Sequence, residues 1–410
     1  MTRDKSDIKP VRLAFVGAGN RGTKYLQWVL EHPDRAVAVA VADSDPVRAA
    51  AFAAEAGIPA DRTFISDEAL FSSDVEADAA VICTPEGAHF RWAMQALGRN
   101  WHLLLEKPVA PTLEECTRLE AEARRTGLVT GVCHVLRYHP YFMALRSLVA
   151  SGELGRPVSV THRVRVGIDR ACHTFVRGPW ADTSATSPVI LSKCCHDVDI
   201  LLWILGSQAV DVESLSGESE FSPANKPAQA GSRCVACAIE RECPYSAVDL
   251  YGRRRDWVNG FTYPTRDEAI ECELQSGRYG RCVYDCGADA VDRQTVIFTT
   301  TSGAIVSLMM DFFTPDDSRI TSITLTKGEI MADGRKIVVT PLKGEQRVID
   351  FSSIASLPNH AGADMALFDD FITAVSTPGR RMRSDISDAI ESHRVCILAE
   401  QSRRSHVKNN

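Results

Sequence analysis

A glycine-rich segment near the start of the chain has the spacing of a dinucleotide-binding turn. It fits the pattern G-x-G-x-x-G with Gly17, Gly19 and Gly22. The segment follows an apolar run at 11–16 and opens a helical pattern at 21–31. In that context the first glycine permits a tight turn, the second lets the backbone approach a pyrophosphate, and the third allows close helix–strand packing. The helix N-terminus then stabilises the anion.

An aspartate stands where the ribose of such a nucleotide would lie. Asp43 ends a second apolar run at 36–42, about 20 residues after the glycines, which is the usual spacing of this motif. A carboxylate there accepts hydrogen bonds from the ribose hydroxyls and repels a 2′-phosphate. The sequence therefore predicts NAD rather than NADP as the cofactor. The alternative is a surface aspartate that happens to follow a glycine-rich turn.

Two further segments carry groups that can move a proton. Glu106-Lys107-Pro108 follows the apolar run 101–105, and residues 192–199 read Ser-Lys-Cys-Cys-His-Asp-Val-Asp before an apolar helix. His196 and Asp199 are three residues apart, so they share one face of that helix. Lysine and histidine are both suited to general acid–base work. Both segments are therefore candidates for the reaction centre.

The elements that must position these groups form two patterns. From residue 11 to about residue 135 (the usual size of a nucleotide-binding unit), apolar runs alternate with amphipathic helical stretches, which indicates βαβ units and a parallel sheet. Ligands of such sheets bind at the carboxyl ends of the strands. The residues 158–166 and 293–350 instead show polar alternation and turn signals, typical of a mixed or antiparallel sheet open on one face.

The predicted fold class is therefore α/β, with two domains. A Rossmann domain with a parallel sheet is expected over 1–138, and an α+β domain with an open-faced mixed or antiparallel sheet over 139–410. Within the second domain, 216–290 is an irregular insertion that contains cysteines. Helices are expected at 141–149, 365–375 and 385–403.

These motifs together resemble the Gfo/Idh/MocA family (glucose–fructose oxidoreductase, inositol dehydrogenase and rhizopine catabolism protein). The resemblance covers nearly the whole chain, and it includes Cys83-Thr84-Pro85 with His89 as well as the segments above. It implies an NAD-dependent oxidoreductase that acts on a carbohydrate. The cofactor-binding residues predicted from the glycine motif and the resemblance are Gly17, Gly19, Asn20, Arg21, Gly22, Asp43, Thr84, Pro85, His89, Glu106 and Lys107.

The resemblance also implies roles at the reaction centre. Lys107 and His196 would flank the hydroxyl that is oxidised, so that one of them removes its proton as hydride leaves for the nicotinamide. Many members of the family carry Asp-x-Gly-x-His, whereas this chain has Ser192 and Cys194 in place of the Asp and the Gly. The predicted base is therefore His196, with Lys107 assisting and Lys193 as a rival.

A basic cluster at 162–177 suggests an anionic substrate. Arg163 and Arg165 share one face of the predicted strand, by its two-residue period. They are either a solvated strand edge or a site for carboxylate, sulfonate or phosphate, which suit the planar guanidinium. For His173 and Arg177, the alternative to a substrate contact is a structural role in a loop. The predicted substrate-binding residues are Tyr138, Arg163, Arg165, His173, Arg177, Trp180, Lys193 and Asp199.

The insertion carries a cysteine pattern typical of a structural Zn²⁺ site with four thiolates. The five candidates are Cys234, Cys237, Cys243, Cys282 and Cys286, with the last two competing for one position. Zinc would hold together an insertion that is expected to have few apolar residues of its own. The alternative is that these cysteines are reduced and pack as small apolar side chains.

The net charge and the first residues of the chain indicate which partners and which location to expect. The net charge of −7 gives no basic field, so neither nucleic acid nor an anionic membrane is an expected partner. The first ten residues are polar and do not resemble an export signal, so we expect a cytoplasmic enzyme with mostly reduced cysteines. The open sheet predicts a homodimer or homotetramer that covers it.

Two reactions fit these residues. The first is a dehydrogenase that transfers hydride to NAD⁺ from a ring carbinol, C3 being expected, of a sugar, an anionic sugar or inositol. The alternative is a redox-neutral glycoside hydrolase, in which transient C3 oxidation allows elimination of the aglycone, addition of water and re-reduction, possible also for a sulfonated sugar. A non-catalytic NAD sensor is disfavoured because Lys107 and His196 would have no task.

Overall fold

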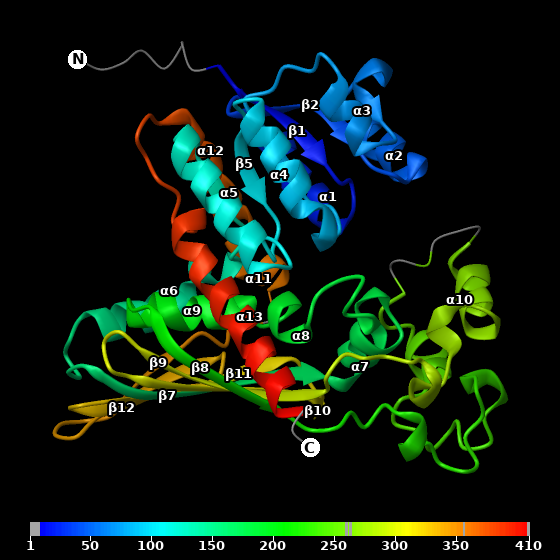
Figure 1. Ribbon diagram of the computed structural model, residues 1–410, viewed down its shortest axis with the longest axis vertical. Coiled ribbons are helices and arrows are strands. Elements are labelled where there is room, and N and C mark those ends of the chain that lie inside the picture. The colour runs from blue at the N-terminus through cyan, green and yellow to red at the C-terminus, as the bar shows by residue number, and fades with distance from the viewer. Residues whose placement is uncertain (1–8, 259–260, 262–264, 356, 408–410) are drawn as a thin grey trace. The chain divides into compact units, whose positions relative to one another are not determined.

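The first sheet is parallel, six-stranded and ordered β3-β2-β1-β4-β5-β6, which confirms the predicted Rossmann sheet (Figure 1). The computed structural model describes residues 9–258, 261, 265–355 and 357–407. The strands are β1 (Val11–Val16), β2 (Ala36–Ala42), β3 (Thr63–Phe64), β4 (Ala79–Ile82), β5 (His102–Leu105) and β6 (Thr130–Val132). The order reverses between β1 and β4, which is where ligands of doubly wound sheets bind.

Amphipathic helices cover this sheet because each turns an apolar stripe inward. They are α1 (Asn20–Glu31), α2 (Pro46–Ala56), α3 (Asp67–Ser72), α4 (His89–Gly98) and α5 (Leu113–Thr126). Trp92 and Ala96 of α4 pack with Leu119 of α5 against buried residues of the strands, including Ile82 and Leu103. The short elements β3 and α3 were not predicted, because two strand residues and six helical residues show too little periodicity.

The second sheet is eight-stranded and mixed, with the order β14-β13-β12-β11-β7-β10-β9-β8. The long strand β7 pairs in parallel with β10 and antiparallel with β11, as the mixed-sheet prediction requires. The strands are β7 (Pro157–Gly167), β8 (Ala209–Ser216), β9 (Arg293–Thr300), β10 (Ile305–Thr314), β11 (Ser318–Leu325), β12 (Gly328–Ala332), β13 (Lys336–Pro341) and β14 (Arg347–Asp350).

The two faces of the second sheet differ in burial. In β10, Val306, Leu308 and Met310 are fully buried, whereas the alternating Ile305 and Met309 are exposed. Strand register places three more exposed apolar residues on the same outer face, namely Ile297, Ile320 and Met331. The predicted open face is thus present and apolar. The homodimer or homotetramer that would cover it stays a prediction.

The chain forms two compact units that interleave along the sequence. One contains residues 1–154, 195–208 and 348–397, and the other contains 155–194, 209–347 and 398–410. The segment 195–208 carries the predicted reaction-centre helix and belongs to the unit with the Rossmann sheet. The domain boundary predicted at residue 138 stays a prediction.

Of the remaining helices of the described residues, four lie close to predicted positions (141–149, the apolar helix after 192–199, 365–375 and 385–403), and four were not predicted. They are α6 (Pro140–Ala150), α7 (Ile168–Ala171), α8 (Val189–Ser192), α9 (Cys195–Leu205), α10 (Arg266–Gln275), α11 (Pro358–Ala361), α12 (Ala363–Ser376) and α13 (Ile386–Val407). Among the helices formed by described residues, none has both the length and the apolar character needed to cross a membrane.

Candidate active site

Steric constraints explain two of the three glycines in the turn after β1. Gly17 has a φ of +101°, and a Cβ there would lie 2.6 Å from the carbonyl oxygen of Cys83. A Cβ on Gly22 would lie 2.2 Å from the carbonyl oxygen of Gly17. Gly19 meets nothing within 4 Å and begins α1 without a side-chain cap. The turn therefore offers uncapped N–H groups to an anion, with open space beside them.

Asp43 connects the end of β2 to this turn. Its Oδ2 accepts a hydrogen bond from Ala18 N at 2.8 Å, and its Oδ1 accepts one from Asp45 N at 2.8 Å. Arg48 also donates to Oδ1, at 2.8 Å. Burial disfavours the charged form, but these bonds hold the pKa of Asp43 below its ordinary value. An ionised carboxylate therefore stands at the strand end, as the NAD prediction requires.

His89 ties together two loops at the carboxyl edge of the sheet. Its ring nitrogens lie 2.9 Å from the carbonyl oxygen of Thr84, after β4, and 2.6 Å from that of Pro108, after β5. The ring is fully buried, and burial lowers the pKa of His89. The sequence predicted a cofactor contact for His89. The geometry instead favours a positioning role, because both ring nitrogens already face backbone carbonyls.

Glu106 and Arg21 support each other in the same region. Glu106 Oε1 accepts hydrogen bonds from Arg21 Nε at 2.6 Å and from the Tyr25 hydroxyl at 2.8 Å. Burial opposes ionisation, but Arg21 and Tyr25 lower the pKa of Glu106 below its ordinary value. This bond network fixes the start of α1 against the loop that carries Lys107.

Several buried polar atoms at this edge make no hydrogen bond to the described residues. They are the Thr84 hydroxyl oxygen, Glu86 Oε1 and His134 Nε2. These residues follow β4 and β6, so they lie at the ligand-binding edge of the sheet. A buried polar atom left unpaired costs about 1–3 kcal/mol, so such atoms mark where a ligand would complete the structure. The residues present therefore fit a nucleotide cofactor.

The structure brings His196 beside a residue that sequence reasoning missed and that follows β6, the strand paired with β5, which precedes Lys107. His134 follows β6, and its Nδ1 lies 3.4 Å from His196 Nδ1. Burial, Arg137 and Lys107 lower the pKa of His134 well below its ordinary value, so the ring is neutral. Its position just after the sixth strand, at the carboxyl edge, is the signal that could have identified it.

A buried ion pair lies behind this cluster. Arg137 donates to both carboxylate oxygens of Asp199, from Nε at 2.9 Å and from Nη2 at 2.6 Å. Asp199 Oδ1 also lies 3.8 Å from His134 Nε2. Burial raises the pKa of Asp199, and Arg137 opposes that rise. Asp199 is 1% exposed, so the geometry favours positioning rather than the substrate contact predicted for it.

Tyr138 and His393 are also buried supports. The Tyr138 hydroxyl donates to Asp370 at 2.8 Å, which favours a structural role over the predicted substrate contact. His393 Nε2 accepts the backbone N–H of Val109 at 2.8 Å. Burial lowers the pKa of His393 to about 3, so it acts as a neutral acceptor. It thereby holds the loop that contains Lys107.

In the second unit, the predicted basic cluster is largely engaged within the protein. Arg163 lies on the open face and pairs with Asp311 at 2.9 Å, while Arg165 pairs with Asp316 at 2.7 Å. His173 stacks on Tyr279, with ring centroids 4.8 Å apart. The sequence predicted substrate contacts for all three of these basic residues, and the geometry favours structural roles instead.

The other predicted residues of the second unit fall into two groups. Arg177 is buried against residues of the insertion, to whose backbone it donates hydrogen bonds, and this disfavours its predicted substrate contact. Trp180 and Lys193 are half-buried, with Lys193 directly after α8. Their predicted roles with the substrate stay predictions, and Lys193 remains the rival base.

The cysteine insertion differs from expectation in its packing. It has an apolar core of its own, in which Leu250, Tyr251 and Ile270 are buried. Among the described residues, no group of three or more His, Cys, Asp or Glu side chains is close enough to hold a metal ion. The described residues therefore do not show a formed zinc site, and zinc binding stays a prediction.

Two family models match the chain. "Oxidoreductase family, NAD-binding Rossmann fold" matches residues 11–134, and "Oxidoreductase family, C-terminal alpha/beta domain" matches residues 146–408. The chain is 29% identical over 303 residues to an inositol 2-dehydrogenase of Streptomyces avermitilis, a match that covers 73% of this chain and 78% of the relative. Both models describe the oxidoreductases named after Gfo, Idh and MocA.

Solved structures share the fold over the full length. An oxidoreductase from Agrobacterium radiobacter, in complex with NAD⁺, L-tartaric acid and magnesium, has a TM-score of 0.69 at 17% identity and covers 96% of both chains. The WlbA dehydrogenase from Bordetella pertussis, in complex with NADH and UDP-GlcNAcA, has a TM-score of 0.67 at 17% identity, with 96% of this chain and 97% of that chain covered. At these identities the likeness concerns the fold.

Proposed function

Because this chain belongs to the Gfo/Idh/MocA family of NAD-dependent oxidoreductases, we propose that it oxidises a ring carbinol of a carbohydrate, at C3 of a sugar, an anionic sugar or an inositol. The observation that carries the proposal is the cluster of Lys107, His134 and His196 at the carboxyl edge of the Rossmann sheet. An inositol dehydrogenase among the relatives supports a polyhydroxylated ring as substrate.

We assign the proton transfer to His196 Nε2, and the contact between the two histidines supports this assignment. His196 Nδ1 faces His134 Nδ1, so one of these nitrogens donates and the other accepts. If His196 donates from Nδ1, its Nε2 is the ring nitrogen that can take the proton of the substrate hydroxyl. His134 then bears its own proton on Nε2, the atom that faces Asp199 Oδ1. The ion pair with Arg137 keeps Asp199 ionised and in place for this arrangement.

Lys107 supplies charge rather than a second base in this scheme. An ammonium group beside the reacting hydroxyl stabilises the alkoxide as it develops. NAD, when bound, supplies the acceptor for the hydride. The backbone N–H groups of the glycine turn hold the pyrophosphate, while the bonds of His89 and Glu106 hold the loops around the nicotinamide.

A redox-neutral glycoside hydrolase is the alternative, and one observation favours it. The cluster contains more than one acid–base group, whereas simple oxidation needs only one proton removed. Elimination of an aglycone also needs removal of the C2 proton and protonation of the leaving group. Both reactions begin with the same oxidation, so the residues assigned above serve either.

One experiment separates the two reactions. The full-length protein is incubated with chromogenic glycosides and with the corresponding free sugars and inositols, with and without added NAD⁺. We expect NADH absorbance to rise with a free sugar or inositol and no aglycone to appear. Aglycone release without net NADH would establish the hydrolase instead. If neither NADH nor aglycone forms above the level of His196→Ala protein, which serves as the blank, the proposed function is wrong.

A second experiment tests the cofactor preference. Removing Asp43 by Asp43→Ala deletes the carboxylate that would bind the ribose, and a bond to a charged group contributes about 1.5–3 kcal/mol, or roughly 10–100-fold in affinity. It also releases Arg48, whose guanidinium suits a 2′-phosphate. We expect weaker NAD binding and stronger NADP binding, both measured by nucleotide titration.

The matched control for this test is Asp45→Ala. Asp45 also pairs with Arg48, at 3.2 Å, but it caps α2 and lies beyond the strand end. We expect this variant to keep the preference for NAD. Wild-type protein that binds NADP as tightly as NAD would show that Asp43 does not have the proposed role.

A further inference from the structure

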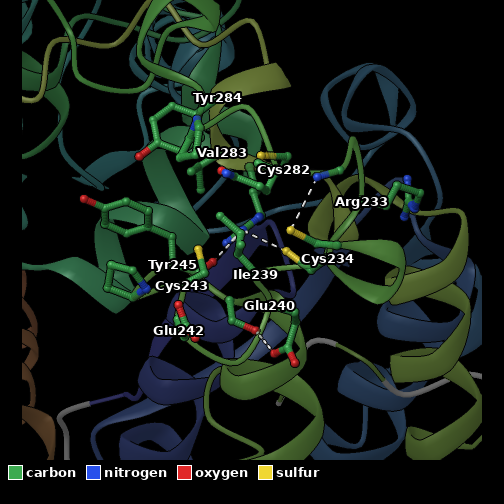
Figure 2. A pocket seen from close by; sticks show the side chains of 18 residues that line it. Arg233, Cys234, Ile239, Glu240, Glu242, Cys243, Tyr245, Cys282, Val283 and Tyr284 are labelled. Carbon is green, nitrogen blue, oxygen red and sulfur yellow. Dashed lines mark hydrogen bonds between the residues drawn. The ribbon is translucent and has the colours of Figure 1, made fainter.

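Four of the five candidate cysteines line one cavity of about 330 Å³ in the insertion. Figure 2 shows Cys234 and Cys243 of one segment and Cys282 of another around this cavity. Cys237 lines it as well, whereas Cys286 does not. The thiol of Cys286 instead donates to the backbone carbonyl of Cys282 at 3.2 Å. The geometry thus separates the four cysteines from the fifth, which the sequence alone left open.

A buried arginine lines the same cavity without a carboxylate partner among the described residues. Arg177 is 2% exposed, and it donates to the carbonyl oxygens of Arg281 at 2.8 Å and Tyr245 at 2.7 Å. Its Nη2 lies 3.7 Å from the sulfur of Cys234, and its Nη1 has no partner. A buried unpaired charge costs several kcal/mol, so negative charge is expected beside it. The lining of the cavity offers negative charge from cysteine sulfurs and from Glu240 and Glu242, and the sulfur of Cys234 is the one that Arg177 contacts.

Backbone groups also donate to these sulfurs. Gly231 N lies 3.4 Å from Cys237 Sγ, and Ala247 N lies 3.4 Å from Cys234 Sγ. N–H groups directed at sulfur are the usual second layer of a metal–thiolate site, since they stabilise the negative charge that the ligands retain. Together with Arg177, they direct donors at the sulfurs of Cys234 and Cys237.

We propose that Cys234, Cys237, Cys243 and Cys282 bind one Zn²⁺ as a tetrathiolate site, with Arg177 as its buried counter-charge. The four thiols release four protons on binding, and the resulting centre carries a charge of −2 (two positive and four negative charges). Zn²⁺ holds thiolate sulfur at about 2.3 Å in a tetrahedron, so binding draws the sulfurs together across the cavity. The ion then joins the segment 234–243 to the segment that carries Cys282.

Metal content and thiol reactivity test this directly. Full-length protein is expressed in medium supplemented with zinc, purified under reducing conditions without chelator, and analysed for metals. We expect about one zinc per chain, as a closed structural site requires. Replacement by Co²⁺ should give the intense sulfur-to-cobalt charge-transfer absorbance of a thiolate site. A colorimetric thiol titration should detect four more reactive cysteines after a strong chelator than before it.

Variants assign the ligands. Cys282→Ser should lose the zinc and the charge-transfer absorbance, whereas the matched Cys286→Ser should keep both. Arg177→Met should bind Co²⁺ at least tenfold more weakly while keeping the tetrahedral spectrum. Should Cys282→Ser fail to fold, the chelator-dependent thiol count of the wild-type protein still decides. Protein without zinc whose thiol count is unaffected by chelator overturns the proposal, and so does loss of metal in Cys286→Ser. The proposal is also wrong if the thiol titration finds these cysteines joined in disulfides.

Discussion

Single-turnover hydride transfer should fall by roughly 10²–10⁴-fold when His196 is replaced by alanine, because general acid–base help of this kind contributes that much. The substitution removes the Nε2 lone pair that takes the hydroxyl proton. Lys107→Ala should be at least as damaging, since it removes the positive charge beside the developing alkoxide. Affinity for NAD should change little in His196→Ala, because α9 lies outside the glycine turn and the strand ends that hold the nucleotide.

The positioning role of His134 predicts a distinct result. His134→Gln keeps a hydrogen-bonding side chain but loses the ring that orients His196, so turnover should fall while KM is largely retained. The pH profile should also shift, because the group facing His196 Nδ1 has changed. Lys193→Ala serves as the matched comparison. If Lys193→Ala is inactive while His196→Ala transfers hydride at near the wild-type rate, the base is Lys193 and the proposed roles are wrong.

The second large effect concerns stability. Arg137→Met should lower the free energy of unfolding by about 3–5 kcal/mol, because it leaves the buried carboxylate of Asp199 without its partner. The double variant Arg137→Met with Asp199→Asn should lose less than the single variant, since no unpaired charge is then buried. Urea unfolding of both proteins, followed by circular dichroism, measures the difference.

The pH dependence of that loss gives an independent check. Without Arg137, burial alone acts on Asp199, so its pKa in the folded protein should rise further above the ordinary value of about 3.9. A group whose folded pKa is raised favours the folded state at low pH and loses that contribution as the pH rises through the folded pKa. The deficit of Arg137→Met should therefore shrink as the pH falls from 7 towards 5. A deficit that is constant over this range would show that Asp199 is not the cause.

The sequence by itself determined the fold class and much of the cofactor site. Alternating apolar runs and helical stretches are local periodicities, so they identify a parallel sheet without knowledge of long-range contacts. The spacing of the glycine turn is likewise local, and Gly22 is required by the carbonyl of Gly17, whereas Gly17 meets Cys83 after the paired strand β4. The strand end at Asp43 follows from its distance to that turn. The spacings of the glycines and of Asp43 can therefore be read within one βαβ unit.

Only the tertiary structure decided which of the residues capable of acid–base chemistry come into contact. His134 and His196 are far apart in sequence, and their contact depends on how α9 packs beside the Rossmann sheet. The same holds for Asp199 and Arg177, which the sequence pattern presents as available polar groups. Folding buries Asp199 against Arg137 and Arg177 beside the cysteine cavity. Periodicity shows which face a side chain occupies. The partner that this face meets depends on contacts between distant segments, and a charged side chain is equally able to pair within the protein or with a ligand.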